Sequence, residues 1–420
     1  MSARWLRTFS SAIAGALTIL LSSCSGIKAP DTLFITFGAG GENLKEDREN
    51  ALSLLTKYSE AFQIANPQTQ IIYLTYPNSE FVKQISLDSK LNLGPDLIIV
   101  TGINGILTQE LLNKSIITTL PDEEYFDAIY NNQIQFTAKD NGQYSFAPAV
   151  ITTQFACFNN TKIKQSPETI QDLEALSSRG YKIGLSSDPI SLLWSAGTQG
   201  AVTEISSIGN QITASQRKYP AIHAWLEWVH KATLYQNIIF EPNELLLKKF
   251  KDNKLDWIAC WGDQFNDLKN KMGSTLSIAA LPNGSQSKAS PAISTYGFAL
   301  GKNSSQSQRE MALKYIKTFV NTVAQRKLQL GNTGFLAANQ NVSIPPESSK
   351  KLNALNTALT EQNNHYSKEW PGVYRWLGFR KNDPQSYWIR YRKLSSAFSE
   401  LTNGYLSVDE TFKIITTTTN

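Results

Sequence analysis

Two histidines and a glutamate in this chain have a spacing that could hold a metal ion. His223, Glu227 and His230 stand at positions i, i+4 and i+7, so a helix would place them along one side. Imidazole nitrogens and carboxylate oxygens are common ligands of zinc. The zinc-protease motif, however, needs a glutamate directly after its first histidine, and Ala224 stands there instead. Polar residues on one flank of a helix are usually solvated, so we expect no metal site.

Residues that could carry out catalysis are also scarce. The chain has 3 histidines, and it contains neither a Gly-x-Ser-x-Gly turn nor a Gly-x-x-x-x-Gly-Lys-Ser/Thr loop. The nucleophile elbow of hydrolases and the phosphate-binding loop of nucleotide enzymes are therefore missing. We predict no catalytic residues, no cofactor and no enzymatic activity. A glycoside hydrolase needs only two carboxylates, so a surface glycoside hydrolase is the enzymatic alternative.

Two cysteines lie in short apolar runs that are typical of buried strands. Cys157 belongs to FACFN and Cys260 to IACWG, and the chain has 3 cysteines in total. In an oxidising compartment these two could form a disulfide, but pairing depends on a distance that their spacing along the chain does not give. A buried free cysteine behaves as a small apolar residue. We therefore expect two buried free thiols, with a disulfide as the alternative.

The third cysteine, Cys24, follows an amino-terminal leader. Arg4 and Arg7 are followed by an apolar run at residues 12–21, which is too short to span a bilayer, since a span needs ~20 apolar residues. We predict a signal peptide at residues 1–23 and a short tether at residues 24–31. The sequence LSSC resembles the lipobox of bacterial lipoproteins, which implies cleavage before Cys24, a diacylglyceryl group on its thiol and an acyl chain such as palmitate on its amine. An ordinary signal peptide with an incidental cysteine is the alternative.

Charge and length limit the classes of function. The formal charge is +5, and removing residues 1–23 deletes two arginines and no acid, which leaves +3. A charge this small, without any block of lysine and arginine, gives no reason to expect a nucleic-acid partner. A mature chain of roughly 400 residues exceeds what one core usually serves, so two or more domains are expected.

The elements that must position these side chains alternate between strands and helices. TLFITF, QIIYLTY and DLIIV are predicted strands, and the apolar residues between 52 and 62 predict a helix that ends before Pro67. Residues 81–91 are weakly helical. This alternation favours an open α/β sheet.

The same alternation restarts after residue 155. FACFNN, YKIGLSS, LDWIACW, LSIAALP and ISTYGFALG are predicted strands. Ser166 with Pro167, and Asp188 with Pro189, predict the starts of two helices, because each pair offers an N-cap followed by proline at the first helical position. One long helix is predicted over residues 307–329. Two successive α/β units imply two lobes.

The order of these segments resembles that of the family 1 extracellular solute-binding proteins, a group that includes maltose-binding protein and other sugar receptors of ABC importers. AFQIANPQTQIIYLTY resembles the family's helix-Asn-Pro-strand opening, and SKLNLGPDLIIV resembles its Pro-Asp turn before an apolar strand. The segment from TLSIAALP to YIKTFV is the closest match, whereas FKDNKLDWIACWG matches only loosely, with Asp252 and Asn253 where a glycine is usual. The resemblance covers residues 32 to about 340 in register.

The resemblance implies an α/β chain with the two-lobed periplasmic binding protein fold (type II, maltose-binding-like). Each lobe would be an open mixed sheet flanked by helices, with further helices at the C-terminus. We expect lobe 1 at residues 32–151 plus 292–338 and lobe 2 at residues 155–290 plus 339–420. The chain would cross between them near residues 151–154 and 290–294. Lobes joined in this way close around a ligand by rotating about the crossings.

A ligand in such a fold lies between the lobes. Sugars present apolar faces and hydroxyl edges, so their sites combine aromatic rings with polar groups. The resemblance implies that some aromatic rings line the cleft, and polar residues beyond strand ends or in a crossing are further candidates. The predicted ligand-binding residues are Trp261, Tyr296, Trp194, Asn43, Asn104, Thr152 and Thr153. An ordinary core, turn or hinge role is the alternative for each. Trp370, Tyr374 and Trp376 could cap the cleft, but we expect them to pack in the core.

These inferences predict a lipid-anchored receptor outside the cytoplasm that binds a solute for an ABC transporter. Its partners would be a small solute, most simply a carbohydrate, the transmembrane subunits of an ABC permease, and the cell membrane through the lipid on Cys24. We expect a monomer, located on the periplasmic side in a Gram-negative cell. A solute sensor lipoprotein that keeps the two lobes but hands its ligand to a signalling partner, without a transport role, is the non-enzymatic alternative.

Overall fold

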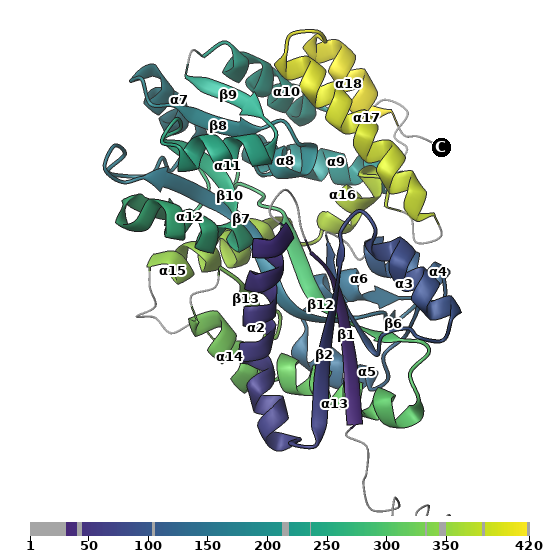
Figure 1. Cartoon of the computed structure of the whole chain (residues 1–420). Coiled ribbons are helices and arrows are strands. Elements are labelled where there is room, and N and C mark those ends of the chain that lie inside the picture. Colours follow the sequence, from purple (N-terminus) through teal and green to yellow (C-terminus); the bar gives the residue numbers. More distant parts are fainter. Residues whose placement is uncertain are drawn as a thin grey trace, which may run out of the picture.

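The computed structural model describes the chain from Asp31 onward in two groups of elements joined by long strands (Figure 1). The described residues are 31–39, 44–102, 106–211, 218–235, 237–331, 334–343, 350–379 and 383–417. We call the group that contains the first strand lobe 1 and the other group lobe 2.

Lobe 1 is a mixed sheet covered by helices on both faces. Its strands follow the order β2-β1-β3-β12, in which β1 is parallel to β2 and β3, and β12 is antiparallel to β3. Its elements are β1 (Asp31–Ala39), α2 (Leu44–Ala65), β2 (Thr69–Pro77), α3 (Phe81–Lys90), β3 (Leu97–Gly102), α4 (Ile106–Asn113), β4 (Ile117–Thr118), α5 (Glu123–Ile129), α6 (Asn132–Ala138), β5 (Lys139–Asp140), β6 (Gln143–Tyr144), β12 (Ile293–Gly301), α13 (Gln306–Val320), α14 (Thr322–Leu330) and β13 (Leu336–Ala337).

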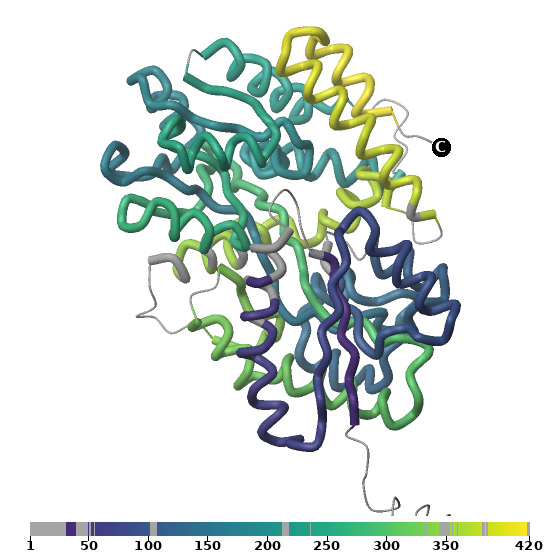
Figure 2. The backbone as a smooth tube through the Cα atoms, viewed as in Figure 1, coloured from purple at the N-terminus to yellow at the C-terminus, as the bar shows by residue number. Residues whose placement is uncertain are grey.

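Lobe 2 is built on the strand order β10-β8-β9, in which all three strands are parallel. The backbone tube in Figure 2 shows that the C-terminal helices, drawn in yellow, lie with this lobe. Its elements are α7 (Ile170–Ser178), β8 (Ile183–Ser186), α8 (Pro189–Thr198), α9 (Ala201–Gly209), α10 (Pro220–Thr233), β9 (Ile238–Glu241), α11 (Asn243–Lys251), β10 (Trp257–Trp261), η2 (Gly262–Gln264), α12 (Phe265–Met272), η3 (Gly273–Thr275), β11 (Leu276–Ala279), α15 (Lys350–Thr357), η4 (Ala358–Asn363), η5 (Asn364–Tyr366), α16 (Trp370–Trp376), α17 (Pro384–Thr402) and α18 (Val408–Thr416).

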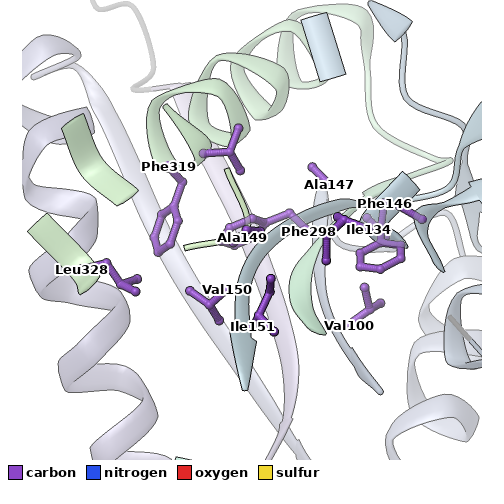
Figure 3. Packing of buried hydrophobic residues seen from close by; sticks show 14 of the residues in the cluster. Val100, Ile134, Phe146, Ala147, Ala149, Val150, Ile151, Phe298, Phe319 and Leu328 are labelled. Atoms are coloured by element: carbon purple, nitrogen blue, oxygen red, sulfur yellow. The ribbon is translucent and has the colours of Figure 1, made fainter. Parts of the chain in front are cut away.

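The strand β7 (Ala147–Asn159) belongs to both lobes and is buried at every residue. Up to Thr153 it pairs with β12, and from Gln154 onward it pairs antiparallel with β10. We call this change of partner the junction. Figure 3 shows the lobe 1 part of β7, where Ala149 and Val150 pack near Phe298 and Phe319 in the first apolar core. That core continues along β7 beneath one face of the lobe 2 sheet, and a second core covers the other face and the C-terminal helices.

Two predicted helix boundaries differ from the structure because a polar side chain caps the helix elsewhere. The helix expected to begin at Pro167 begins at Ile170 instead, since Thr169 and Asp172 form a capping box. The predicted single helix over residues 307–329 is two helices, because the extended residue Asn321 ends α13 and its side chain accepts from the Ala324 N–H at the start of α14. The start predicted at Asp188 is confirmed, and its carboxylate accepts from the Ser191 N–H.

The expectation of two free thiols is wrong, because Cys157 and Cys260 form a disulfide between β7 and β10. In this antiparallel pair Cys157 lies opposite Ile258 and Cys260 lies opposite Phe155, so the two cysteines are diagonal neighbours. Their Cα atoms are 5.9 Å apart, within the range that a disulfide can bridge. Strand register decided this pairing, and cysteines 103 residues apart in the sequence do not reveal a register.

None of the helices in the described part of the chain combines the length and the apolar character that a membrane span requires.

Candidate functional site

The carboxyl ends of strands from both lobes meet at the junction. β10 ends at Trp261, which lies opposite Gln154 of β7. β3 ends at Gly102, which lies opposite Thr295 of β12, and Thr295 in turn lies opposite Ile151 of β7. Ligands of open α/β sheets bind beyond the carboxyl ends of strands, so the junction is the first place to look for a site.

Trp261 lies at this edge with its side chain partly exposed, in a loop held by two contacts. Its backbone N–H donates to Gln264 Oε1 at 2.9 Å. The next residue, Gly262, lies so close to Gly334 that a Cβ atom on Gly262 would be 2.2 Å from the Gly334 carbonyl oxygen. Glycine is therefore required at Gly262, and the backbone before Phe335 supports the loop that presents the indole ring.

Tyr296 of β12 connects to this loop through a hydrogen bond between the lobes. Its hydroxyl donates to Asp263 Oδ2 at 2.8 Å, and the Asp263 N–H donates to Thr152 Oγ1 at 3.1 Å. The ring of Phe335 packs edge-on against Tyr296 with 5.6 Å between the ring centroids. Asp263, Tyr296 and Phe335 are therefore joined by direct contacts, and Trp261 precedes Asp263 by two residues with its ring packed against the second core. We call these four residues the junction cluster.

Asp263 is an exposed residue, and its carboxyl faces Tyr296 of lobe 1. Partial desolvation of the carboxyl raises the pKa of Asp263, and the hydrogen bonds from Tyr296 and from backbone N–H groups partly offset the rise. A carboxylate that is crowded by protein and still reached by solvent can accept hydrogen bonds from a ligand.

A second carboxylate lies at the end of the strand beside β10. β8 is parallel to β10, so Asp188, two residues beyond the end of β8, lies at the same edge as Trp261. The Tyr391 hydroxyl on α17 donates to Asp188 Oδ2, and burial together with the Asp188 charge raises the pKa of Tyr391 well above its usual value. The indole ring of Trp388, one turn earlier on α17, packs edge-on against Tyr391 and is 46% exposed.

Asp263, Asp188, Phe335, Trp388 and Tyr391 were not among the predicted site residues. A local signal was present for the two acids, because Asp188 and Asp263 each lie two residues past a strand end. The three aromatic residues gain their position from residues distant in sequence.

Several predicted site residues have structural contacts instead of an exposed surface. Trp194 is fully buried beside Trp257, so its ring has no free face for a ligand in this structure. Thr153 is also fully buried, and its hydroxyl donates to the Ala292 carbonyl at 3.1 Å, which links the two crossing strands. Thr152 is 1% exposed and supports Asp263 as described above.

Other predicted residues lie away from the junction cluster or outside the described part of the chain. Asn43, Asn104 and Cys24 lie outside the described residues. The rings of the C-terminal aromatic cluster are buried in the second core, as expected for core packing: Trp370, Tyr374 and Trp376.

His223, whose spacing from Glu227 and His230 suggested a metal site, makes exposed polar contacts instead. His223 Nδ1 lies 3.4 Å from Glu227 Oε1, and His223 Nε2 lies 3.1 Å from Asp409 Oδ1. Within the described ranges, no group of three or more histidine, cysteine, aspartate or glutamate residues is placed to hold a metal ion.

A shallow depression of about 420 Å³ lies on the outer face of α13. Two of its lining lysines are already bonded to other parts of lobe 1, Lys314 to Asn66 and Lys317 to Asp122. All its lining residues belong to α13 or its C-terminal end, so lobe 2 contributes nothing to it. The junction cluster is therefore the stronger candidate site.

Solved structures of sugar-binding receptors are similar to this chain over almost their whole length. The GacH receptor of Streptomyces glaucescens, solved unliganded and with acarbose, has a TM-score of 0.64 at 14% identity, with 92% of this chain and 97% of that chain covered. The maltose-binding protein MalE of Listeria monocytogenes in complex with maltose has a TM-score of 0.63 at 17% identity, with 93% and 98% covered. A chitin oligosaccharide binding protein has a TM-score of 0.65 at 14% identity, with 93% and 98% covered.

At these identities the likeness establishes the fold. The chain has the two-lobed, maltose-binding type of α/β fold, as the sequence predicted. These neighbours are described as binding proteins or receptors. No protein-family model matches the chain, and no curated protein sequence matches it.

Proposed function

We propose that this chain is an extracytoplasmic solute-binding protein of the family 1 type, which captures a sugar between its lobes for an ABC importer. The observation that carries the proposal is the junction cluster, in which Asp263 of lobe 2, two residues after Trp261, accepts a hydrogen bond from Tyr296 of lobe 1. The sugars named for the neighbouring structures, acarbose, maltose and chitin oligosaccharide, support this class of ligand.

The side chains around the junction match the two surfaces of a sugar ring. The indole of Trp261 offers an apolar face on which the C–H face of a sugar stacks. The carboxylates of Asp263 and Asp188 accept hydrogen bonds from hydroxyl groups, and such charged hydrogen bonds are stronger than neutral ones. Because the cluster includes both lobes, a bound sugar would contact both.

Contact with both lobes makes closure depend on the ligand. The strand β7 crosses the junction beside the segment that enters β12 at Ile293, and rotation about these two crossings would change the distance between Tyr296 and Asp263. Shifting a population from 1:99 to 99:1 needs a preference of about 10⁴-fold, or about 5.5 kcal/mol, for the closed state. Stacking and carboxylate hydrogen bonds from lobe 2, together with a contact to Tyr296 of lobe 1, can supply that preference. The closed form would then be recognised by the permease.

The division at residues 32–151 plus 292–338 and 155–290 plus 339–420 is part of the proposal. The partner change of β7 between Thr153 and Gln154 supports it. We further propose that Cys24 carries a lipid that attaches a monomeric receptor to the cell membrane. The buried disulfide supports a location outside the cytoplasm, because disulfides persist mainly in oxidising compartments.

Thermal denaturation with and without sugars tests the function. We expect a maltodextrin or another oligosaccharide to raise the Tm of the chain from Ser25 onward, because a ligand that binds only the native state at 100 times its Kd stabilises it by about 2.7 kcal/mol. Monosaccharides, polyols and phosphorylated glycerols complete the screen. If no sugar raises the Tm and an oligosaccharide is instead cleaved over hours, the receptor proposal fails and the glycoside hydrolase replaces it.

Trp261→Ala is expected to weaken sugar binding about 30-fold, which corresponds to about 2 kcal/mol of lost stacking. Isothermal titration with the best sugar from the screen measures the change. The matched control is Tyr405→Ala, since Tyr405 is an aromatic residue that is 80% exposed after α17. Equal affinity of Trp261→Ala and wild type would remove the indole from the site.

Asp263→Asn is expected to weaken sugar binding about tenfold without lowering the free energy of unfolding at neutral pH. The affinity falls because a neutral acceptor makes weaker hydrogen bonds than a carboxylate. The stability does not fall because the raised pKa of Asp263 means that folding disfavours its charged form above that pKa. As the pH falls through the raised pKa, wild type should gain stability relative to the variant and lose sugar affinity. Titration and urea unfolding between pH 4 and pH 8 measure both. A variant that is less stable at neutral pH but binds normally would show that Asp263 is structural.

A further inference from the structure

The outward face of α3 and the turn that follows it carry leucines that the fold leaves exposed. Leu87 is 46% exposed, Leu91 is 68% exposed and Leu93 is 72% exposed. We call these three residues the leucine patch. On the inward face, Phe81 and Ile85 fill the lobe 1 core, so α3 is already anchored without them. Exposed apolar residues that gather within seven positions indicate an interaction surface more often than scattered ones do.

Positive charge surrounds the leucine patch. Lys83 and Lys90 share the outward face of α3 with Leu87, at spacings of four and three residues. Asp88, the acidic residue of this helix, accepts hydrogen bonds from the Tyr76 hydroxyl and from the Gln84 side-chain amide. The loop after β12 adds Lys302, since the next residue, Asn303, donates to the Ser89 carbonyl at 2.6 Å. Three lysines (Lys83, Lys90 and Lys302) and two acids (Glu80 at the N-cap of α3, and Asp88) therefore border the leucine patch, which leaves a net positive charge around its apolar centre.

The amino-terminal end of β1 lies beside the turn that carries Leu91 and Leu93. The Asp96 N–H donates to the Phe34 carbonyl, and the Phe34 N–H donates to Asp96 Oδ2, each at 2.9 Å. Phe34 is three residues after Asp31, the first described residue, which is a distance of about 10 Å along a strand. Residues 24–30 therefore join lobe 1 near the leucine patch.

We propose that the leucine patch of lobe 1 lies against the surface of an anionic lipid bilayer. The proposal rests on the membrane attachment proposed for Cys24. From Cys24 to Asp31 the chain spans at most about 25 Å, which keeps this part of lobe 1 close to the bilayer. Leucine side chains enter the boundary between headgroups and acyl chains, and lysines are attracted to anionic headgroups.

Charge also distinguishes a lipid surface from a second copy of this chain. Two copies that met through the leucine patch would bring Lys83, Lys90 and Lys302 against the same positive residues. Like charges facing each other oppose association. An anionic bilayer offers both an apolar layer for the leucines and a negative charge for the lysines.

An environment-sensitive fluorophore at the patch tests the proposal. The chain from Ser25 onward has no free thiol apart from an introduced one, because Cys157 and Cys260 are paired. We would label Leu91→Cys with a nitrobenzoxadiazole dye and attach the protein, through an amino-terminal histidine tag, to vesicles of phosphatidylglycerol, phosphatidylcholine and a nickel-chelating lipid. The control carries the dye at Leu234→Cys, which is 74% exposed in lobe 2. The tag replaces the lipid of Cys24, so the result depends neither on lipidation nor on sugar binding.

We expect attachment to raise the emission at residue 91 about threefold with a blue shift, and to leave the emission at residue 234 unchanged. Lys83→Glu with Lys90→Glu should abolish the rise, as should vesicles without phosphatidylglycerol. An unchanged emission at residue 91, or an equal rise at both residues, overturns the proposal. A rise that occurs only in membranes containing the permease also overturns it, and would make the leucine patch a protein-docking surface.

Discussion

Replacing Cys157 and Cys260 together by alanine is expected to lower the free energy of unfolding by about 4 kcal/mol. The disulfide closes a loop of 103 residues, and a loop of that length loses enough entropy in the unfolded chain to stabilise the fold by about 4 to 5 kcal/mol. Both cysteines are fully buried, so alanine avoids placing a hydroxyl in the core. Urea unfolding at 25 °C, followed by tryptophan fluorescence, measures the change.

The single variant Cys157→Ala separates the stability that comes from the disulfide bond from the stability that comes from packing of the sulfur atoms. It also breaks the disulfide, so it should lose nearly as much stability as the double variant. Wild type unfolded in the presence of a reducing agent should approach the same midpoint. Equal unfolding midpoints for wild type and both variants would show that the disulfide adds nothing. Because the bond lies next to Trp261, sugar affinity at temperatures where the variant stays folded is a further measurement of interest.

Arg390→Ala is expected to lower the free energy of unfolding by about 3 kcal/mol, because the Arg390 guanidinium holds three C-terminal helices together. It is 3% exposed on α17 and donates to the carbonyls of Trp376, Ile414 and Ile415. These carbonyls lie at the C-terminal ends of α16 and α18, where the helix dipoles favour a positive charge. Burial lowers the pKa of Arg390 to about 10, so the side chain stays charged at neutral pH. Removing it leaves acceptors without this donor inside the protein.

Two control variants identify the cause of that loss. Lys393→Ala removes an exposed cation from the same helix and should change the stability by less than about 0.5 kcal/mol. Arg390→Met keeps most of the buried volume but provides no donor, so it should recover only about 1 kcal/mol relative to alanine. Thermal and urea unfolding should agree for all of them. Full stability of Arg390→Met would show that packing, and not hydrogen bonding, is the contribution of Arg390.

The sequence predicted the long strands and several helices because each of these depends on neighbours along the chain. Apolar alternation identified β1, β2 and β10, and the pair Asp188 and Pro189 identified the start of α8. The incorrect predictions of elements concern helix boundaries. At each of them, a polar side chain caps the helix at a position that the apolar pattern does not show. Thr169 offers a better cap than Ser166 because Asp172 completes a capping box, and Asn321 ends a helix whose apolar stripe continues past it.

The candidate site was predicted only where a residue stands at the end of an element. Trp261 and Tyr296, the predicted residues that belong to the junction cluster, lie at or near strand ends next to a crossing. Trp194 was predicted from its place near a helix end, but α8 is buried at every residue, so its ring lies inside lobe 2. Asp263 and Asp188 also follow strand ends, but the contacts that distinguish them, with Tyr296 and Tyr391, join residues 33 and 203 positions apart.

What the sequence alone determined is the main strands of both lobes, several of the helices between them, and the alternation that implies two lobes. These follow from periodicity and from short-range capping, which any stretch of the chain carries within itself. The places where the chain crosses between lobes were expected only from the family resemblance. Tertiary structure decided the pairing of Cys157 with Cys260, the burial of Trp194 and the contact between Tyr296 and Asp263. Each of these depends on strand register or on helix placement across a large distance in sequence. Register is set by the packing of the complete sheet, so no segment of the chain contains it.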